Sequence, residues 1–171
     1  MCTVTFIPNN NKAIITSNRD EKYWRSIALP PQAYSFKSGN IFFPKDEDAG
    51  GTWFAVHENG NTIVFLNGAF VKHEPNPPYR KSRGIILLDI LDTDQSIQKS
   101  FSSIDLTDIE PFTAILFNQK QLLECRWDGK QKHQHILNIQ KPYIWSSSTL
   151  YDENTIEKRK NWFQQWLQIN P

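Results

Sequence analysis

Hydrophobic and polar positions alternate along the beginning of the chain as they do in a half-buried strand. The alternation covers residues 3–7, and residues 13–16 begin a return strand after the turn Pro8-Asn9-Asn10-Asn11. The ends of antiparallel strands meet across the ladder. We therefore expect Cys2 to lie near the segment Asn18-Arg19-Asp20, at one end of this hairpin.

Further apolar runs predict more strands, joined by turn sequences. Glu58-Asn59-Gly60-Asn61 predicts one hairpin and Asn118-Gln119-Lys120 predicts another. The predicted strands are residues 41–43, 52–56, 62–66, 112–117 and 122–127, with weaker candidates at 130–136 and 143–145. Pro30-Pro31 and Ser38-Gly39-Asn40 indicate an irregular connection, and the proline-rich residues 74–78 indicate a surface loop.

Three helices complete the predicted pattern. Ser82 is a suitable cap for a helix over residues 83–91, which is apolar on nearly all sides and therefore buried on more than one side. A second helix is expected over 92–101, with Thr93 or Asp94 as its cap. The last is expected over 153–167, and its apolar stripe consists of Ile156, Phe163, Trp166 and Leu167. Helices of this kind favour a layered α/β architecture in a single domain over residues 1–171.

Composition excludes several classes of function. The 19 Lys and Arg residues nearly balance 18 Asp and Glu residues, so no basic surface indicates a nucleic-acid partner. No apolar run approaches the roughly 20 residues of a transmembrane helix, and no export signal is evident. Only Cys2 and Cys125 are cysteines, which fits a reducing compartment, and we expect a cytoplasmic protein.

Cys2 is the residue with the most distinctive chemistry. Removal of Met1 would place a nucleophilic thiol and a free α-amine on one residue. That amine has an ordinary pKa of about 7.7–8.0, so it can accept a proton near neutral pH. The alternative is that Cys2 is a small apolar residue that opens a strand. The sequence leaves open whether Met1 is removed.

Several short motifs together resemble the NRDE family, which includes the Transport and Golgi organisation protein 2 group. They are Met1-Cys2-Thr3, residues 16–21 (TSNRDE), Gly50-Gly51-Thr52-Trp53, Leu66-Asn67-Gly68, residues 77–84 (PPYRKSRG) and, more loosely, residues 146–151 (SSSTLY). The resemblance covers most of the chain. It also extends, over fewer positions, to the penicillin V acylases and bile salt hydrolases, which begin with Met-Cys and hydrolyse non-peptide amides.

The resemblance implies an α+β fold of the N-terminal nucleophile hydrolase type. Two stacked antiparallel sheets would lie between helical layers, in a four-layer αββα sandwich. NRDE proteins usually run longer than this chain, which leaves two alternatives open: a sequence that lacks C-terminal elements after Pro171, or a short variant of the family. The Ser146-Ser147-Ser148 segment also lacks the asparagine that related acylases place late in the site.

The same resemblance implies roles for individual residues. Cys2 stands in the place of the family nucleophile, and Arg19 would favour its thiolate by charge. Asp20 would hold the α-amine or the substrate nitrogen, and Asn67 would donate to the oxyanion. Substrate contacts are assigned to Asn18, Trp53 and Arg159.

Each of these residues also has a plainer interpretation. Arg19 and Asp20 can be a surface pair at a strand end, and Asn67 with Gly68 can be an ordinary turn. Trp53 can belong to the core, Arg159 can be a solvated helix residue, and Gly50-Gly51 can serve backbone geometry. The four histidines show no metal-ligand spacing with the cysteines, and no phosphate-binding loop is present. We therefore expect neither a metal nor another cofactor.

Two hypotheses of function follow from the resemblance, beside the plainer alternative of a family member with neither activity. In the first, the protein is a cysteine N-terminal nucleophile amidohydrolase that cleaves a small non-peptide amide through Cys2. In the second, it is a non-catalytic carrier for an apolar ligand such as a lipid or haem, with Trp53, Phe54 and Phe65 lining the cleft. A homo-oligomer is compatible with both hypotheses.

Overall fold

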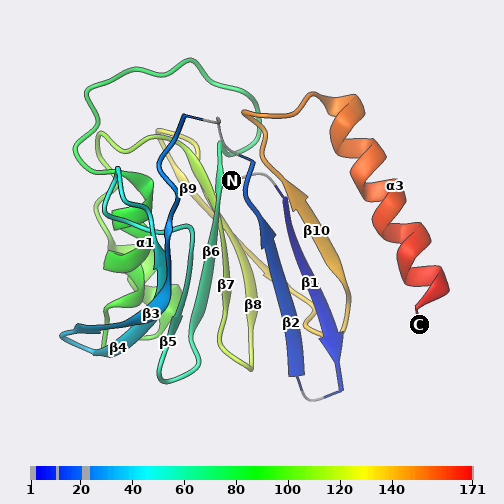
Figure 1. The fold of residues 1–171 in the computed structure, drawn as a ribbon, viewed down its shortest axis with the longest axis horizontal. Coiled ribbons are helices and arrows are strands. Elements are labelled where there is room, and N and C mark those ends of the chain that lie inside the picture. The colour runs from blue at the N-terminus through cyan, green and yellow to red at the C-terminus, as the bar shows by residue number, and fades with distance from the viewer. Residues whose placement is uncertain (1–2, 11, 21–23, 171) are drawn as a thin grey trace.

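The fold is a four-layer sandwich of two antiparallel sheets between helices (Figure 1). The structure, a computed structural model, describes residues 3–10, 12–20 and 24–170 of the 171-residue chain. The smaller sheet has the strand order β10-β1-β2, and the larger has the order β3-β4-β5-β6-β7-β8-β9. Helices α1 and α2 cover the outer face of the larger sheet, and α3 lies outside the smaller one. The four-layer arrangement predicted from the sequence is confirmed.

The strands follow the predicted pattern closely. Their bounds are β1 Thr3–Asn9, β2 Lys12–Asn18, β3 Leu29–Phe36, β4 Gly39–Lys45, β5 Phe54–His57, β6 Thr62–Asn67, β7 Phe112–Phe117, β8 Leu122–Trp127, β9 Lys132–Leu137 and β10 Tyr143–Ser146. The helices are α1 Arg83–Leu91, α2 Ile97–Ser103 and α3 Glu153–Ile169. Every pairing between neighbouring strands is antiparallel.

Two predicted elements are corrected. The segment that contains Pro30 and Pro31 is strand β3 and not an irregular connection. Prolines are tolerated there because β3 pairs only with β4, as an edge strand, and its register shifts between Leu29 and Gln32. The second helix begins at Ile97 rather than at residue 92, because the Ser96 hydroxyl accepts the Lys99 N–H as the cap.

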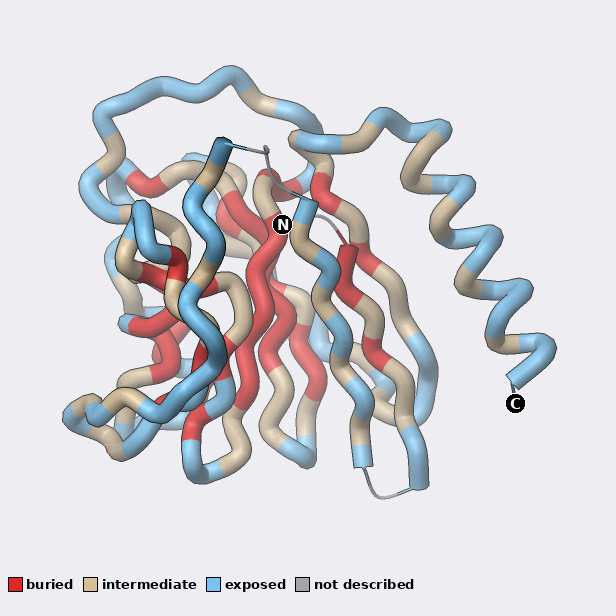
Figure 2. The backbone as a smooth tube through the Cα atoms, viewed as in Figure 1, coloured by how far each residue is buried: buried red, intermediate tan, exposed pale blue. Residues whose placement is uncertain are grey.

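The hydrophobic core has two parts, one on each face of the larger sheet. Ile63 and Phe65 of β6 pack toward α1 and α2, whereas Val64 and Leu66 pack between the two sheets. Alternate side chains of a strand point to opposite faces, so a strand buried on both faces is apolar throughout. Figure 2 shows the result: the buried residues concentrate in the central strands and in the helical layer behind them.

Helix α1 is fixed at the position predicted for it. The Ser82 hydroxyl accepts the Ile85 N–H at its N-terminus, as expected for the cap. Five of its nine residues are buried, in agreement with its apolar sequence. None of the helices in the described part of the chain has the length and apolar character needed to cross a membrane.

Candidate active site

The candidate site lies at the end of the sandwich where β1 begins. Thr3, the first residue of β1, pairs with Asn18 at the end of β2 and with Ser146 at the end of β10. The next residue along, Ser147, donates from its hydroxyl to the backbone carbonyl of Asn67 at the end of β6, over 2.8 Å. The ends of four strands from both sheets therefore meet here. Cys2 lies outside the described residues, so its role stays a prediction.

A cavity of about 380 Å³ opens at this end. Three of the residues predicted to act in catalysis or substrate binding line it: Arg19, Trp53 and Asn67. They come from different elements, since Arg19 follows β2, Trp53 precedes β5 and Asn67 ends β6. The remaining lining residues are Arg25, Asp46, Ala49, Gly51, Thr52, Phe65, Tyr79, Lys81, Ser82, Arg83, Gly84 and Glu110. Of the two phenylalanines assigned to the cleft in the carrier hypothesis, Phe65 lines the cavity and Phe54 does not.

Asp46 pairs with two of the basic side chains that line this cavity. Its Oδ2 accepts from Nη2 of Arg19 at 3.0 Å and from Nη2 of Arg25 at 2.8 Å. Its Oδ1 accepts the Ala49 N–H at 3.0 Å, and only 11% of the side chain is exposed. Burial by itself would raise the pKa of Asp46, but the Ala49 hydrogen bond and the charges of Arg25 and Arg19 outweigh it. The pKa of this carboxyl is therefore held below its ordinary value, and Asp46 is a carboxylate at neutral pH.

Arg19 is held on two sides. Besides its ion pair with Asp46, its guanidinium lies 4.6 Å from the centre of the Trp53 ring. A guanidinium stacked on an aromatic face is stabilised by the ring quadrupole. Trp53 is therefore both a wall of the cavity and a support for Arg19.

The loop that carries Asp46 is closed by its own backbone. The Asp46 N–H donates to the Gly51 carbonyl and the Gly50 N–H donates to the Asp46 carbonyl, each over 2.8 Å. Gly51 then passes so close to Gly84, at the start of α1, that a Cβ on Gly51 would lie 2.4 Å from the Gly84 carbonyl carbon. A glycine at this position lets the loop reach the helix, in agreement with the backbone role considered for Gly50-Gly51.

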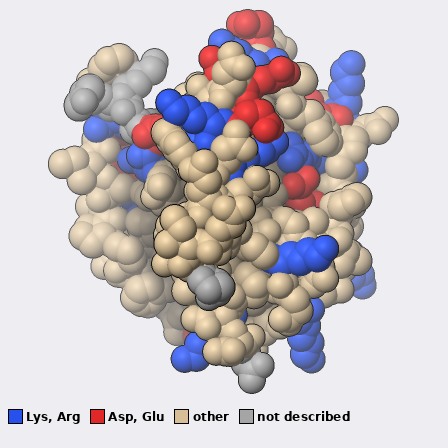
Figure 3. Space-filling view, turned by 90° about the vertical axis from the view of Figure 1, so that its right-hand side faces the viewer, with Lys and Arg blue, Asp and Glu red and all other residues tan. Residues whose placement is uncertain are grey.

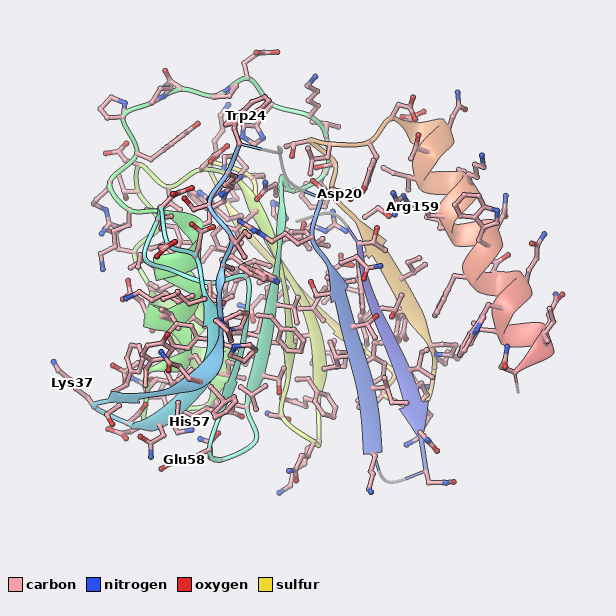
Figure 4. The ribbon with its side chains drawn as sticks, in the orientation of Figure 1. Asp20, Trp24, Lys37, His57, Glu58 and Arg159 are labelled. Atoms are coloured by element: carbon pink, nitrogen blue, oxygen red, sulfur yellow. The ribbon has the colours of Figure 1, made fainter. Side chains whose placement is uncertain are left out.

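A second cluster, of Asp20, Tyr151 and Arg159, lies beside Thr3. The Tyr151 hydroxyl donates to the Asp20 carboxylate, and Nη2 of Arg159 lies 3.8 Å from the same carboxylate oxygen. Nη1 of Arg159 donates to the Thr3 hydroxyl at 2.9 Å, and its guanidinium stacks 4.1 Å from the centre of the Tyr151 ring. Figure 4 shows Asp20 and Arg159 together between the sheet and α3.

This cluster does not line the cavity. Asp20, Arg159 and Asn18 are all absent from the residues around the 380 Å³ space. Figure 3 looks onto the face of the molecule that carries α3, and the acidic side chains of this face lie in its upper half. Figure 4 places Asp20 at the same upper end. The structure thus divides the predicted residues into a cavity group and a group that joins α3 to the start of β1.

The opposite wall of the cavity is built from the start of α1. Nη2 of Arg83 pairs with Glu110 at 3.0 Å, and Nη1 donates to the Pro111 carbonyl at 3.2 Å. The other Glu110 oxygen lies 3.3 Å from Nε2 of His73. Arg83 therefore has a carboxylate of its own, distinct from the one that Arg19 and Arg25 share.

A Ser-His-Asp group elsewhere in the chain is not arranged for catalysis. The Ser38 hydroxyl donates to Asp92 at 2.7 Å, and the Asn59 N–H donates to Nδ1 of His57 at 3.1 Å. Nε2 of His57, 3.1 Å from the Ser38 oxygen, must then be the donor and cannot take the serine proton. Figure 4 places His57 at the opposite end of the sandwich from Asp20.

Two further observations concern the described residues only. Within them, no three His, Cys, Asp or Glu side chains are grouped so as to hold a metal ion. Cys125 is fully buried, and burial raises the pKa of its thiol to about 12. A thiol with so high a pKa is a poor nucleophile at neutral pH.

Comparison with solved structures identifies the class of fold. An N-acylethanolamine-hydrolyzing acid amidase ortholog from Caenorhabditis elegans is similar with a TM-score of 0.65 and 11% identity, over 92% of this chain and 73% of that one. Conjugated bile acid hydrolase from Clostridium perfringens has a TM-score of 0.57 and 12% identity, over 94% of this chain and 57% of that one. Penicillin V acylase from Agrobacterium tumefaciens has a TM-score of 0.55 and 12% identity, over 96% of this chain and 57% of that one.

The fold is therefore that of the N-terminal nucleophile hydrolases, as the resemblance implied. The chain belongs to the Transport and Golgi organisation 2 family, whose family model matches residues 1–170. It spans little more than half the length of the bile acid hydrolase and the acylase. No curated protein sequence matches it significantly.

Proposed function

We propose that the protein is a cysteine N-terminal nucleophile amidohydrolase that cleaves a small non-peptide amide. One observation supports this most: Arg19, Trp53 and Asn67 come together around a single cavity at the end of the sandwich where β1 begins. Cys2 is covalently bonded to Thr3, the first residue of that strand. The fold shared with amidases and acylases is consistent with the proposal.

The proposed reaction begins after Met1 has been removed. The Cys2 thiol gives its proton to its own α-amine, and the sulfur attacks the carbonyl carbon of the amide. The oxyanion that forms accepts a hydrogen bond from the Asn67 side-chain amide, an interaction worth about 2.7–4 kcal/mol in a well-studied case. The C–N bond breaks and the amine leaves with the proton from the α-amine. Water then hydrolyses the thioester, which releases the carboxylic acid and restores the thiol.

The charges in the proposed site support this assignment of roles. Arg19 is a fixed cation held by Asp46, and a neighbouring cation lowers the pKa of a thiol. Asp20 is held by Tyr151 and Arg159 beside Thr3, where a carboxylate would hold the α-amine of the preceding residue. In this proposal Arg159 positions Asp20 and does not contact the substrate directly.

The carrier hypothesis has less support from the cavity. Trp53 and Phe65 are the aromatic lining residues suited to an apolar ligand, but four basic side chains and two carboxylates share the same walls. Charged walls must be desolvated when an apolar molecule enters, which opposes its binding. A polar or charged small molecule fits this lining better.

The direct test compares two substitutions of the same residue type. Cys2→Ala is expected to abolish both hydrolysis of small amides, followed by the released amine, and labelling by iodoacetamide at neutral pH. Cys125→Ala is the matched control and is expected to leave both unchanged, because the Cys125 thiol is buried and its pKa is about 12. Turnover that survives in Cys2→Ala would rule out the proposed reaction.

A further inference from the structure

A second cavity, of about 660 Å³, lies at the end of the sandwich where β1 finishes, opposite the candidate active site. The β1–β2, β5–β6 and β7–β8 turns meet there, at the lower end of the molecule in Figure 1. No described residue lines both cavities. A volume of this size is typical of a binding site for a small molecule. The walls come from the segments 6–10, 12–13, 58–61, 117–120 and 139–140.

The inner wall of this cavity is apolar and belongs to the core between the two sheets. Phe6 of β1 is buried, and Ala13, Phe117 and Ile139 are half-buried and pack against the same core. The rings of Phe6 and Phe117 meet edge to face, with their centres 5.4 Å apart. Apolar surface that is still half-exposed gains free energy when a ligand covers it. Aromatic rings in such an arrangement favour a further ring at a face or an edge.

The charged residues around this cavity are basic. Lys12 and Lys120 line it, whereas no Asp or Glu among the described residues does so. The wall segments contain one carboxylate in their sequence, that of Glu58. Glu58 is directed to β4, where it accepts from the backbone and side-chain nitrogens of Asn40 at 3.0 and 2.9 Å. The candidate active site differs, because Asp46 and Glu110 line that cavity together with its basic residues.

Gln119 adds a polar group at the mouth of this cavity. Its φ of +66° is uncommon for a residue other than glycine, and residues with such backbone conformations are frequent at ligand-binding sites. A Cβ on Gly60 would lie 2.9 Å from Nε2 of Gln119, so the side-chain amide reaches from the β7–β8 turn to the β5–β6 turn. This exposed amide can donate to an oxygen of a ligand that enters between the turns.

We infer that this second cavity binds a small aromatic carboxylate. The ring of the ligand covers the apolar wall at Phe117, and its carboxylate faces Lys12 and Lys120 at the mouth. An ammonium offers three donors and a compact positive charge, which suits a carboxylate that stays partly in water. The site is separate from the one proposed for hydrolysis, and its occupation does not depend on Cys2.

The experiment measures binding by calorimetry with three probes that differ in one feature each. The first is 2-naphthylacetate, which has both the ring and the charge. The second, 2-(2-naphthyl)ethanol, lacks the charge, and the third, decanoate, lacks the ring. Wild type is expected to bind 2-naphthylacetate with a Kd at least about fourfold lower than the Kd of either other probe.

Substitutions of exposed lysines test the charge without disturbing the core. Lys12→Gln and Lys120→Gln are each expected to raise the Kd of 2-naphthylacetate by about two- to fivefold, and the double variant should bind the acid no better than the alcohol. Lys99→Gln removes the same charge from the exposed side of α2, away from both cavities, and is expected to behave as wild type.

Amide NMR signals of glycines show which cavity is occupied. Saturation with 2-naphthylacetate is expected to shift the signal of Gly60, which lines the second cavity, and to leave those of Gly51 and Gly84 in place. Shifts confined to Gly51 and Gly84 would overturn the inference. So would the absence of saturable binding, equal affinity for the acid and the alcohol, or a double variant that binds like wild type. Decanoate that binds as tightly as 2-naphthylacetate would overturn the assignment of an aromatic ligand.

Discussion

The two helical layers of the sandwich are attached in different ways. Five of the nine residues of α1 are buried, whereas α3 has seventeen residues and none of them is buried. Figure 2 shows this contrast between the two sides of the molecule. The larger sheet and α1 thus share a conventional hydrophobic core. Within the part of the chain that the structure describes, α3 has half-buried side chains at most and is joined to the smaller sheet by the polar cluster at Arg159.

The different packing of α1 and α3 affects the candidate site, because the site lies between these two helical layers. The cavity wall formed by Ser82, Arg83 and Gly84 belongs to α1 and is therefore backed by the core. The Asp20 cluster depends on Arg159 and Tyr151, at the start of the weakly packed side. We expect substitutions on the α1 side to act mainly on stability. Substitutions on the α3 side should act mainly on the local arrangement around Thr3.

The largest effect is expected in the core behind α1. Leu87→Ala removes a side chain with no exposed surface and is expected to lower the free energy of unfolding by about 2–5 kcal/mol. Phe163→Ala, on the half-buried face of α3, is the counterpart and is expected to cost less than about 1.5 kcal/mol. Urea unfolding measures both, and similar costs would contradict the contrast between the layers.

The next effect concerns the contact between the Asp46 loop and α1. Gly51→Ala would bring a Cβ within 2.4 Å of the Gly84 carbonyl carbon and 2.7 Å of the Ile85 nitrogen, both of which are backbone atoms. A cost of about 1–3 kcal/mol is expected from such overpacking. Gly50→Ala is the control, since a Cβ there meets nothing within 4 Å and only its φ of +68° opposes the change. A Gly51 variant as stable as wild type would show that the loop is not tightly packed on the helix.

A smaller effect is expected for the polar anchor of α3. Arg159→Gln loses the bond to the Thr3 hydroxyl and the ion pair with Asp20, for a cost of about 1 kcal/mol. Hydrogen exchange should become faster in α3 and remain unchanged in α1. Lys160→Gln, which loses only an exposed pair with Glu157 on the same helix, serves as the control. Faster exchange in α1 as well would mean that the two layers are coupled.

The smallest effect is the pH dependence that Asp46 contributes. The pKa of Asp46 is lowered on folding, so its stabilising contribution is present above the ordinary value of 3.8 and is lost as the pH falls through the lower folded value. The difference in urea midpoint between wild type and Asp46→Asn should therefore be constant above the ordinary value of 3.8 and shrink as the pH falls below it. Asp89→Asn, which changes a surface carboxylate, is the matched comparison. A difference for Asp46→Asn that grows on acidification would contradict the lowered pKa.

Much of the fold could be predicted because its signals are local. The apolar residues of α1 and the cap at Ser82 gave the helix its observed bounds, and turn sequences placed the β5–β6 and β7–β8 hairpins. The prediction of an irregular connection at Pro30-Pro31 was wrong, because an edge strand accommodates these prolines. The sequence alone does not show which strand lies at an edge.

The site could be predicted only in part, because contacts between residues distant in sequence leave no local signal. Arg19, Trp53 and Asn67 were found through motifs, and the fold brings them to one cavity. Asp46 was missed because its partners Arg19 and Arg25 lie 27 and 21 residues away in sequence, in a different strand connection. Its position in the acidic run Asp46-Glu47-Asp48 is typical of a solvated loop.

Tyr151 was missed for a related reason. It pairs with Asp20 across 131 residues, and only the packing of both sheets brings the two together. Arg159 was assigned to the substrate from sequence, and its observed contacts are with Asp20, Thr3 and Tyr151. Roles that depend on tertiary partners therefore require the structure.

Intact-mass analysis is the sharpest test of whether residue 2 acts as an N-terminal nucleophile. Natively expressed protein is mixed briefly with N-phenylacetylglycinamide and the reaction is quenched in acid. The intact mass of the protein is then measured by mass spectrometry, and any adduct is mapped by proteolysis. We predict a mass that lacks Met1 and a phenylacetyl adduct confined to Cys2. Retention of Met1 would leave the amine of Cys2 in a peptide bond, and this result, or an adduct at another residue, would rule out Cys2 as the nucleophile.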